Sequence, residues 1–393
     1  KSGGKADTTN ISSGSRQVVE KDGTATGSNI SAGGSLIVYT GGIAHGVNQE
    51  TGSALVANTG AGTDIEGYNK LSHFTITGGE ANYVVLENTG ELTVVAKTSA
   101  KNTTIDAGGK LIVQKEAKTD STRLNNGGVL EVQDGGEAKH VEQQSGGALI
   151  ASTTSGTLIE GTNSYGDAFY IRNSEAKNVV LENAGSLTVV TGSRAVDTII
   201  NANGKMDVYG KDVGTVLNSA GTQTIYASAT SDKANIKGGK QTVQNYGKAI
   251  NTDIVSGLQQ IMVNGTAEGS IINGGSQVVN EGGLAENSVL NDGGTLDVRE
   301  KGSATGIQQS SQGALVATTR ATRVTGTRAD GVAFSIEQDA ANNILLADGG
   351  VLTVESDTSS DKTQVNMGGR EIVKTKATAT GTTLTGGEQI VEG

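Results

Sequence analysis

Residues 108–132 read GGKLIVQKEAKTDSTRLNNGGVLEV, and this segment contains one pattern twice. Each copy opens with two glycines, and apolar residues then recur at every second position, as in GGKLIV (108–113) and GGVLEV (127–132). Alternation of this kind is the periodicity of a β-strand. The two copies begin nineteen residues apart, which leaves no room for a helix of useful length between them. The segment therefore predicts short strands that recur at a fixed step.

A step of nineteen residues recurs through much of the chain, first in pairs of glycines. The pairs are 108–109, 127–128 and 146–147, then 274–275 and 293–294, and then 349–350 and 368–369. Apolar residues keep the same step and form columns. The columns are Leu92, Leu111, Leu130 and Leu149; Val94, Val113, Val132 and Ala151; Leu86, Ile105 and Leu124; Ile271 and Leu290; and Val279, Val298 and Ala317. We therefore expect equivalent residues of successive copies to lie on top of one another.

A coil of stacked strands accounts for these columns. A turn with two or three short strands can close once around an axis, so that each strand pairs in parallel with its counterpart about 4.8 Å away in the preceding turn. The Leu and Val columns then fill a narrow core, and glycine makes the corners because it adopts positive φ without a steric clash. The sequence predicts an all-β fold, a parallel β-helix (β-solenoid) of about twenty turns with roughly 19 residues per turn.

The composition agrees with a narrow interior. The 393 residues include 59 Gly and three Phe, but no Trp, Pro or Cys. Proline cannot donate a hydrogen bond to a neighbouring strand, so a chain whose strands are paired on both sides excludes it. The absence of cysteine excludes disulfides and thiol chemistry. The net charge of −11 argues against nucleic acid as a partner and against binding to a membrane surface through basic residues.

A longer module occurs three times. Its most recognisable part reads YVVLENTGELTVV at 83–95, NVVLENAGSLTVV at 178–190 and NILLADGGVLTVE at 343–355. The whole modules lie near 52–111, 146–206 and 312–373. We interpret them as copies of one building block in a single β-helix domain, residues 1–393, rather than as three active sites.

Each module also contains a longer connection with one phenylalanine. The three are Phe74, Phe169 and Phe334, and they are the only phenylalanines of the chain. Because they occupy equivalent positions, we expect them to fill a local widening of the solenoid, and a role in ligand binding is the less favoured alternative.

The repeats resemble a known family. Segments such as GGVLEVQDGGEAKH (127–140) and GGTLDVREKGSATG (293–306) are similar to the passenger repeats of self-associating autotransporters, the group that contains the adhesin involved in diffuse adherence and antigen 43. The resemblance covers essentially the whole chain. It implies a right-handed parallel β-helix at the surface of a Gram-negative bacterium, tethered to the outer membrane through a C-terminal barrel. It also implies a role in cell aggregation, biofilm formation or adhesion.

Neither a signal peptide nor the alternating strands of an outer-membrane barrel is evident, so we expect the chain to be part of a longer protein. The resemblance implies identical passengers on neighbouring cells as the partner, with a host surface receptor or glycan as a further possibility. The membrane would be reached only through the C-terminal barrel.

Catalytic motifs are not evident. The three histidines, His45, His73 and His140, have no serine or carboxylate partner at a recognisable spacing. The Gly-Gly-x-Gly-x-Asp calcium repeat of other β-rolls is missing. Carboxylates such as Glu87 and Glu182 recur because the module recurs. The sequence predicts no enzyme, no cofactor and no metal site, and a polysaccharide-processing β-helix with paired carboxylates is the least favoured alternative.

A polar position recurs on one edge of the predicted coil and supplies the candidate self-association residues. They are Asn102, Ser121 and His140 at steps of nineteen, and by the same local pattern Asn178, Asp197, Asn251, Asn287 and Asn343. Each residue by itself is most simply a solvated turn residue. Gly306 and Gly381 interrupt the row. In the resembled family, self-association runs through polar positions of this kind, and a host-directed adhesin of the same fold is the alternative.

Overall fold

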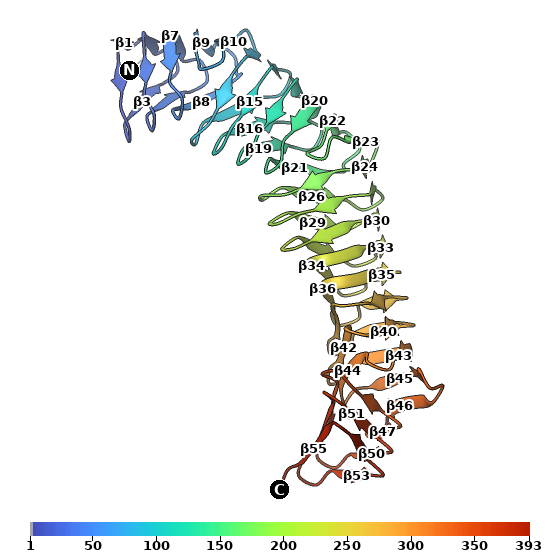
Figure 1. Ribbon diagram of the computed structural model, residues 1–393. Coiled ribbons are helices and arrows are strands. Elements are labelled where there is room, and N and C mark those ends of the chain that lie inside the picture. The colour runs from blue at the N-terminus through green and yellow to red at the C-terminus, as the bar shows by residue number, and fades with distance from the viewer. Residues whose placement is uncertain (1–2) are drawn as a thin grey trace. The chain divides into compact units, whose positions relative to one another are not determined.

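The computed structural model describes residues 3–393, and its regular elements are 55 β-strands (Figure 1). Most strands pair in parallel with a strand about nineteen residues away. The predicted β-solenoid of about twenty turns with about 19 residues per turn is confirmed. The described residues contain no helix long and apolar enough to cross a membrane.

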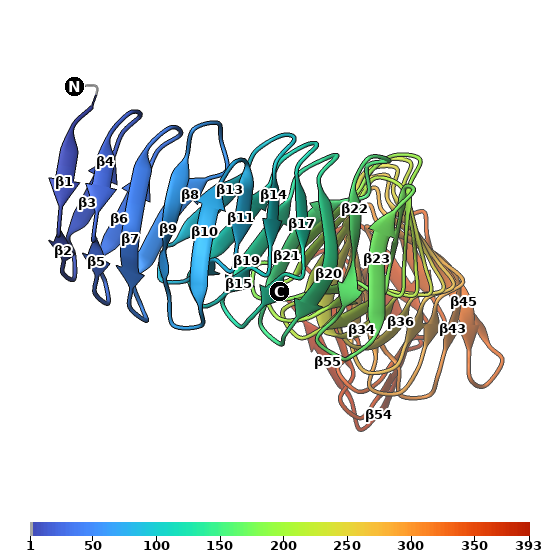
Figure 2. The same cartoon turned by 90° about the horizontal axis from the view of Figure 1, so that it is seen from above.

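The chain divides into two compact units. The first extends to Thr198 and includes Asn203–Lys205, and the second comprises Ile199–Ala202 and Met206–Gly393. Within the first unit, the opening turns lie side by side in both views (Figures 1 and 2).

The predicted leucine and valine columns are present in the first unit. Leu92 lies opposite Leu111 and Leu111 opposite Leu130, and all three are fully buried. The valines two residues further on are paired in the same way. Burying a leucine contributes about 1.5–3 kcal/mol, so this ladder supplies much of the stability of these turns. The strands are β13 (Glu91–Val94), β16 (Lys110–Val113) and β19 (Val129–Val132).

One predicted column is wrong. Ile271 does not share a column with Leu290, because it lies opposite Val289 and its residue is 42% exposed. Leu290 instead lies opposite the buried Ile272, eighteen residues earlier. The local step is therefore eighteen, and a step of nineteen assigns an outward-facing residue to the core. The two strands are β38 (Ile271–Ile272) and β41 (Val289–Leu290).

Four turns of the second unit replace the leucine by a buried glutamine. Gln277 lies opposite Leu296, which places the glutamines in the leucine column. From the second glutamine on, each Nε2 donates to the Oε1 of the preceding glutamine, at 2.8, 2.7 and 2.6 Å in chain order. This glutamine ladder consists of Gln223, Gln241, Gln259 and Gln277, all at most 1% exposed. Its strands are β32 (Thr222–Ile225), β34 (Asn235–Val243), β36 (Asp253–Ile261) and β39 (Ser276–Val279).

A buried carboxylate closes the first end of the glutamine ladder. Asp212, in β30 (Lys211–Val213), accepts hydrogen bonds from Gln223 Nε2 at 2.7 Å, Thr215 Oγ1 at 2.6 Å and Ser231 Oγ at 2.7 Å. Burial raises the pKa of Asp212 above its ordinary value, because removal from water disfavours the charged form. The ladder therefore ends on an acceptor rather than on an unpaired amide.

The longer connection of each module forms an antiparallel hairpin. In the first module, β9 (Asp64–Tyr68) pairs with β10 (His73–Thr77), and β10 pairs with β11 (Glu80–Asn82). The corresponding strands of the second module are β22 (Leu158–Thr162), β23 (Ala168–Arg172) and β24 (Glu175–Lys177). Those of the third are β45 (Arg323–Arg328), β46 (Ala333–Glu337) and β47 (Ala340–Asn342).

The three phenylalanines are buried in these hairpins, each opposite a glycine. The pairs are Phe74 with Gly67, Phe169 with Gly161, and Phe334 with Gly326. A Cβ on Gly161 would lie 2.0 Å from the carbonyl oxygen of Val141 in the preceding turn, so no larger residue fits there. The aromatic ring thus fills the space beside a glycine that the close approach of two turns requires.

Candidate functional site

The eight candidate self-association residues occupy one kind of backbone position. Asn102, for example, lies between β14 (Ser99–Lys101) and β15 (Thr104–Ile105) and has φ +53°. All eight have φ between +49° and +58°, the left-handed region. They are Asn102, Ser121, His140, Asn178 and Asp197 in the first unit and Asn251, Asn287 and Asn343 in the second.

The glycines that interrupt the row have the same conformation. Gly306 and Gly381 both have φ +67°. Asparagine and glycine are the residues that adopt left-handed φ at least cost, so the backbone bend selects the residue type. The bend is held between turns, since the backbone N–H of Asn102 donates to the carbonyl of Asp120 and that of Ser121 to the carbonyl of Lys139, each at 3.0 Å. We call these bends the corner positions.

Two of the eight side chains bind the backbone of their module's hairpin. Asn178 Nδ2 donates to the carbonyl of Ala168 at 3.0 Å, and Asn343 Nδ2 donates to that of Ala333 at 3.2 Å. Both asparagines are half-buried and hold the hairpin of their module in place. The other six corner side chains are exposed: Asn102, Ser121, His140, Asp197, Asn251 and Asn287.

Neighbouring carboxylates bind some of the exposed corner side chains. His140 Nδ1 and Asp120 Oδ1 lie 2.7 Å apart, and Ser121 Oγ donates to the same oxygen at 3.1 Å. The bond from His140 holds the pKa of Asp120 below its usual value. In the second unit, Asn251 Nδ2 donates to Asp232 Oδ1 at 3.1 Å. The structure therefore pairs His140 and Asn251 with carboxylates of the preceding turn, whereas Ser121 bonds its neighbour in the chain.

Charges beside the corners of the first unit are paired across turns or along one strand. Lys101 Nζ lies 2.9 Å from Glu80 Oε2 of the preceding turn, and Lys139 Nζ lies 2.8 Å from Glu137 Oε1 of its own strand. The hydrogen bond from Lys101 lowers the pKa of Glu80, and that from Lys139 lowers the pKa of Glu137. Exposed pairs contribute little to stability, about 0–1 kcal/mol each. As a result, the edge around the corner residues carries positive and negative side chains that are paired with one another.

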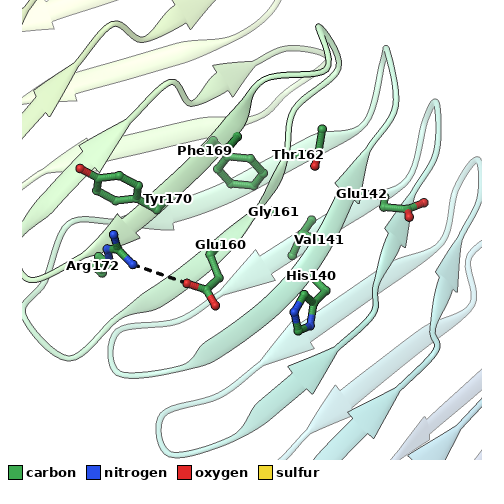
Figure 3. Close-up of a pocket in the computed structure, with 10 residues that line it drawn as sticks. His140, Val141, Glu142, Glu160, Gly161, Thr162, Phe169, Tyr170 and Arg172 are labelled. Carbon is green, nitrogen blue, oxygen red and sulfur yellow. Dashed lines mark ion pairs between the residues drawn. The ribbon is translucent and has the colours of Figure 1, made fainter.

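The second module has a groove that the sequence did not predict. It has a volume of about 510 Å³ and lies over β22, β23 and β20 (Glu137–Gln143), as Figure 3 shows. The polar side chains that line it are His140, Glu142, Glu160, Thr162, Tyr170 and Arg172. The only signal in the sequence was the module itself, because nothing local indicates that these residues meet.

Some polar side chains of the groove have only distant partners within the protein. Arg172 lies over the ring of Tyr170, 4.4 Å from its centroid, and its Nη1 is 3.7 Å from Glu160 Oε2. The hydroxyl of Tyr170 donates to Glu175 Oε1 at 2.5 Å. Among residues 3–393, no three His, Asp or Glu side chains gather closely enough to hold a metal ion.

Comparison with known proteins places these features in a family. The family model described as the adhesin of the bacterial autotransporter system, probable stalk, matches residues 66–128, 160–221, 256–313 and 325–387. The probable autotransporter YpjA of Escherichia coli (strain K12) is 91% identical over 412 residues, which cover 96% of this chain and 27% of that protein. The chain thus spans about a quarter of the length of this relative.

A solved structure also matches along the chain. It is the TibC-catalysed, hyper-glycosylated fragment of TibA, at 19% identity and a TM-score of 0.34, and the match covers 99% of this chain and 100% of the fragment. A likeness at this TM-score carries no argument. The matched family model covers more than half of the chain in its four segments. The chain therefore belongs to the adhesins of the bacterial autotransporter system.

Proposed function

We propose that this chain is the self-associating part of an autotransporter passenger, displayed at the bacterial surface and tethered to the outer membrane. Its partner is an identical passenger on a neighbouring cell, and the result is aggregation and biofilm formation. It acts by binding rather than by catalysis. The observation that supports this most directly is the repetition of exposed polar side chains at the corner positions of each unit.

Repetition makes weak contacts useful. A single hydrogen bond between two passengers contributes about 0.5–1.5 kcal/mol net. Once one corner residue is engaged, its neighbours one turn away are held close to the equivalent residues of the partner, so that further bonds form as if within one molecule. Several corner contacts can therefore give a firm but reversible grip.

A settling assay on cells that display the passenger tests the proposal. Displaying cells should clump and settle without host cells, whereas cells with an empty vector should stay dispersed. A host-directed adhesin would instead leave displaying cells dispersed but let them attach to host surfaces, and that outcome would overturn self-association.

The decisive variant combines Asn102→Lys, Ser121→Lys and Asp197→Lys. Lysine fits the corner backbone, because Lys233 and Lys362 occupy corner positions with φ +57° and +55°. The variant should fold normally but repel an identical passenger, so settling should fall to the empty-vector rate. Undiminished settling would contradict a role of the corners.

A matched control places the same charge on another edge. Glu116 lies at a different bend and has φ +63°. Lys97, with φ +65°, occupies the same bend in the preceding turn, and its backbone N–H donates to the Glu116 carbonyl. Glu116→Lys therefore adds positive charge at a bend that tolerates lysine. This variant should settle like the unaltered passenger.

A further inference from the structure

The first and second modules share the same hairpin but differ in two cross-strand pairs of its outer face. One is Glu66 with Thr75 in the first module and Glu160 with Tyr170 in the second. In the other, also next to the Phe–Gly pair, the first module has Tyr68 opposite His73, and the second has Thr162 opposite Ala168. All of these side chains are on the outer face of their hairpin, because they neighbour the inward-facing Phe and Gly along the strands. The two modules thus offer a covered and an uncovered version of one surface.

In the first module this surface is filled by the protein itself. The rings of Tyr68 and His73 meet edge to face, with centroids 5.0 Å apart. His73 Nε2 lies 3.1 Å from Glu66 Oε2, and the backbone N–H of Gly46 donates to Glu66 Oε1 at 2.8 Å. These two bonds hold the pKa of Glu66 below its usual value. The carboxylate therefore has a partner on each oxygen.

In the second module the same surface is open. Glu160 is the counterpart of Glu66, and within residues 3–393 its one ion-pair partner is Arg172 at 3.7 Å, beyond hydrogen-bond distance. The carboxylate of Glu142, in the preceding turn, forms no ion pair or hydrogen bond within residues 3–393. Figure 3 shows the Glu160 carboxylate between Arg172 and His140. The result is an open groove with acceptors that lack close partners.

We propose that this groove binds a saccharide, with one sugar ring over the space that Tyr68 and His73 occupy in the first module. A volume of about 510 Å³ is typical of a small-ligand site. Hydroxyl groups can donate to Glu142 and Glu160 and accept from Arg172. An aromatic side chain of a peptide would fill the space but leave both carboxylates unpaired, at a cost in free energy.

The charges of the groove restrict the sugar. Glu160 lies beside Arg172, and Glu142 lies at the other end of the groove. Lys139 also interacts with Glu160, but it is already paired with Glu137. The carboxylates thus outnumber the cations, so the site disfavours a uronic acid and favours a neutral or amino sugar. This site is additional to the homotypic contact of the proposed function, because it does not require a second passenger.

Calorimetric titration of the purified 393-residue protein tests the proposal with defined probes. Chitosan tetramer supplies amino sugars, maltotetraose neutral sugars and tri-galacturonate acidic ones. The proposal expects saturable binding of at least one of the first two and at least tenfold weaker binding of tri-galacturonate. Failure of both non-acidic probes to bind at millimolar concentration overturns it, as does preferential binding of the acidic probe.

The double variant Thr162→Tyr with Ala168→His gives the second module the Tyr–His pair that fills this surface in the first. It should reduce saccharide affinity at least tenfold, with an unchanged circular dichroism spectrum, because the first module already accommodates this pair. Glu160→Gln should weaken binding without filling the groove. Unchanged affinity in both variants would overturn the site.

The third module provides the matched control. Thr327 lies opposite Ala333 there, but Thr325 and Gln308 stand in place of Glu160 and Glu142. Thr327→Tyr with Ala333→His should leave saccharide binding unchanged. A fourth titration uses N-acetyl-tyrosine amide, which represents a peptide ligand. If that probe binds more tightly than the saccharides and competes with them, the ligand is a protein and the proposal fails.

Discussion

The leucine turns of the first unit and the glutamine turns of the second fill the same core column, one with apolar side chains and the other with polar ones. Leu111 touches Leu92 and Leu130 above and below and needs no polar partner. Gln259 occupies the same column, but its amide donates to Gln241 Oε1 and its oxygen accepts from Gln277 Nε2. Because each turn stacks on an equivalent turn, a buried glutamine needs polar partners in the adjacent turns, whereas a leucine needs none.

A neighbouring column of hydroxyl groups supports the glutamines. Gln259 Nε2 also donates to Thr252 Oγ1 at 3.0 Å, and Ser270 Oγ donates to Gln259 Oε1 at 3.0 Å. In the leucine turns the same column contains Thr103, whose buried Oγ1 has no hydrogen-bond partner. A buried amide is thus tolerated where a hydroxyl and two further amides complete its hydrogen bonds.

Placing a glutamine among leucines should have the largest effect. Leu130→Gln would bury an amide between Leu111 and Leu149, and Val141 stands where a glutamine turn has a serine or threonine. We expect a loss of about 4 kcal/mol, because the new amide oxygen would face Val141 instead of a hydroxyl donor and apolar burial is lost. Hydrogen exchange of peptides from β19 measures this local stability.

Leu111→Gln sharpens this prediction. Thr103 and Thr122 stand near that turn in the hydroxyl column, and Thr103 Oγ1 is unpartnered. The new amide can therefore bond, and the loss should be smaller than for Leu130→Gln. Equal losses would show that the hydroxyl column does not decide the outcome.

The reverse exchange should cost somewhat less. Gln259→Leu removes the acceptor of Gln277 Nε2 and of Ser270 Oγ, and we expect a loss of about 3 kcal/mol, measured by exchange in β36 and β39. Replacing all four ladder glutamines by leucine should cost less than the sum of the four single changes, because no amide is then left without a partner. Strictly additive losses would contradict a cooperative ladder.

Asp212→Asn should stabilise the second unit near neutral pH. The raised pKa means that the folded protein binds the proton more tightly than the unfolded chain does. Stability is therefore greatest below the ordinary aspartate pKa and falls as the pH rises through the folded-state value. Asparagine has no such titration and can still bond Gln223, Thr215 and Ser231. Thermal unfolding should show an advantage for the variant at pH 7 that disappears near pH 4, and a constant difference would contradict this.

The smallest effects should come from the hydroxyl column. Thr252→Val removes an acceptor of Gln259 Nε2 and should cost about 1 kcal/mol. Thr103→Val removes a hydroxyl that has no partner, so it should be neutral or slightly stabilising. Exchange rates of β36 for the first variant and of β16 for the second provide the measurement. Equal losses in the two variants would contradict the distinction between the turns.

The sequence was sufficient for the stacked strands and the leucine columns, because a column of identical apolar residues at a constant step has one simple explanation. It was insufficient for the glutamine ladder. Gln223, Gln241, Gln259 and Gln277 recur at steps of eighteen, each two residues before a buried Ile or Val, but a glutamine is ordinarily a surface residue. The change of step also explains why Ile271 was placed in the wrong column.

The corner positions show a different limit. The recurrence of asparagine predicted a polar edge, but φ is the property that the corner residues share with Gly306 and Gly381. Side-chain use then depends on distant segments, as with Asn178, which binds the hairpin of its own module. The groove of the second module could not be predicted. It is open because Thr162 and Ala168 are smaller than Tyr68 and His73, which fill the same surface in the first module.

Cysteine cross-linking tests the central claim, that each residue lies over its counterpart at a step of nineteen in the leucine turns and eighteen in the glutamine turns. The chain has no cysteine, so paired cysteines can be introduced without interference. Thr93 lies opposite Ile112, and Thr224 opposite Thr242. Parallel neighbours about 4.8 Å apart are within disulfide range. Two aligned cysteine pairs should each oxidise to an intramolecular disulfide, seen by intact mass: Thr93→Cys with Ile112→Cys, and Thr224→Cys with Thr242→Cys. Two offset pairs should not form a disulfide: Thr93→Cys with Lys110→Cys, and Thr224→Cys with Lys240→Cys. Disulfides in the two offset pairs and none in the aligned pairs would contradict the account.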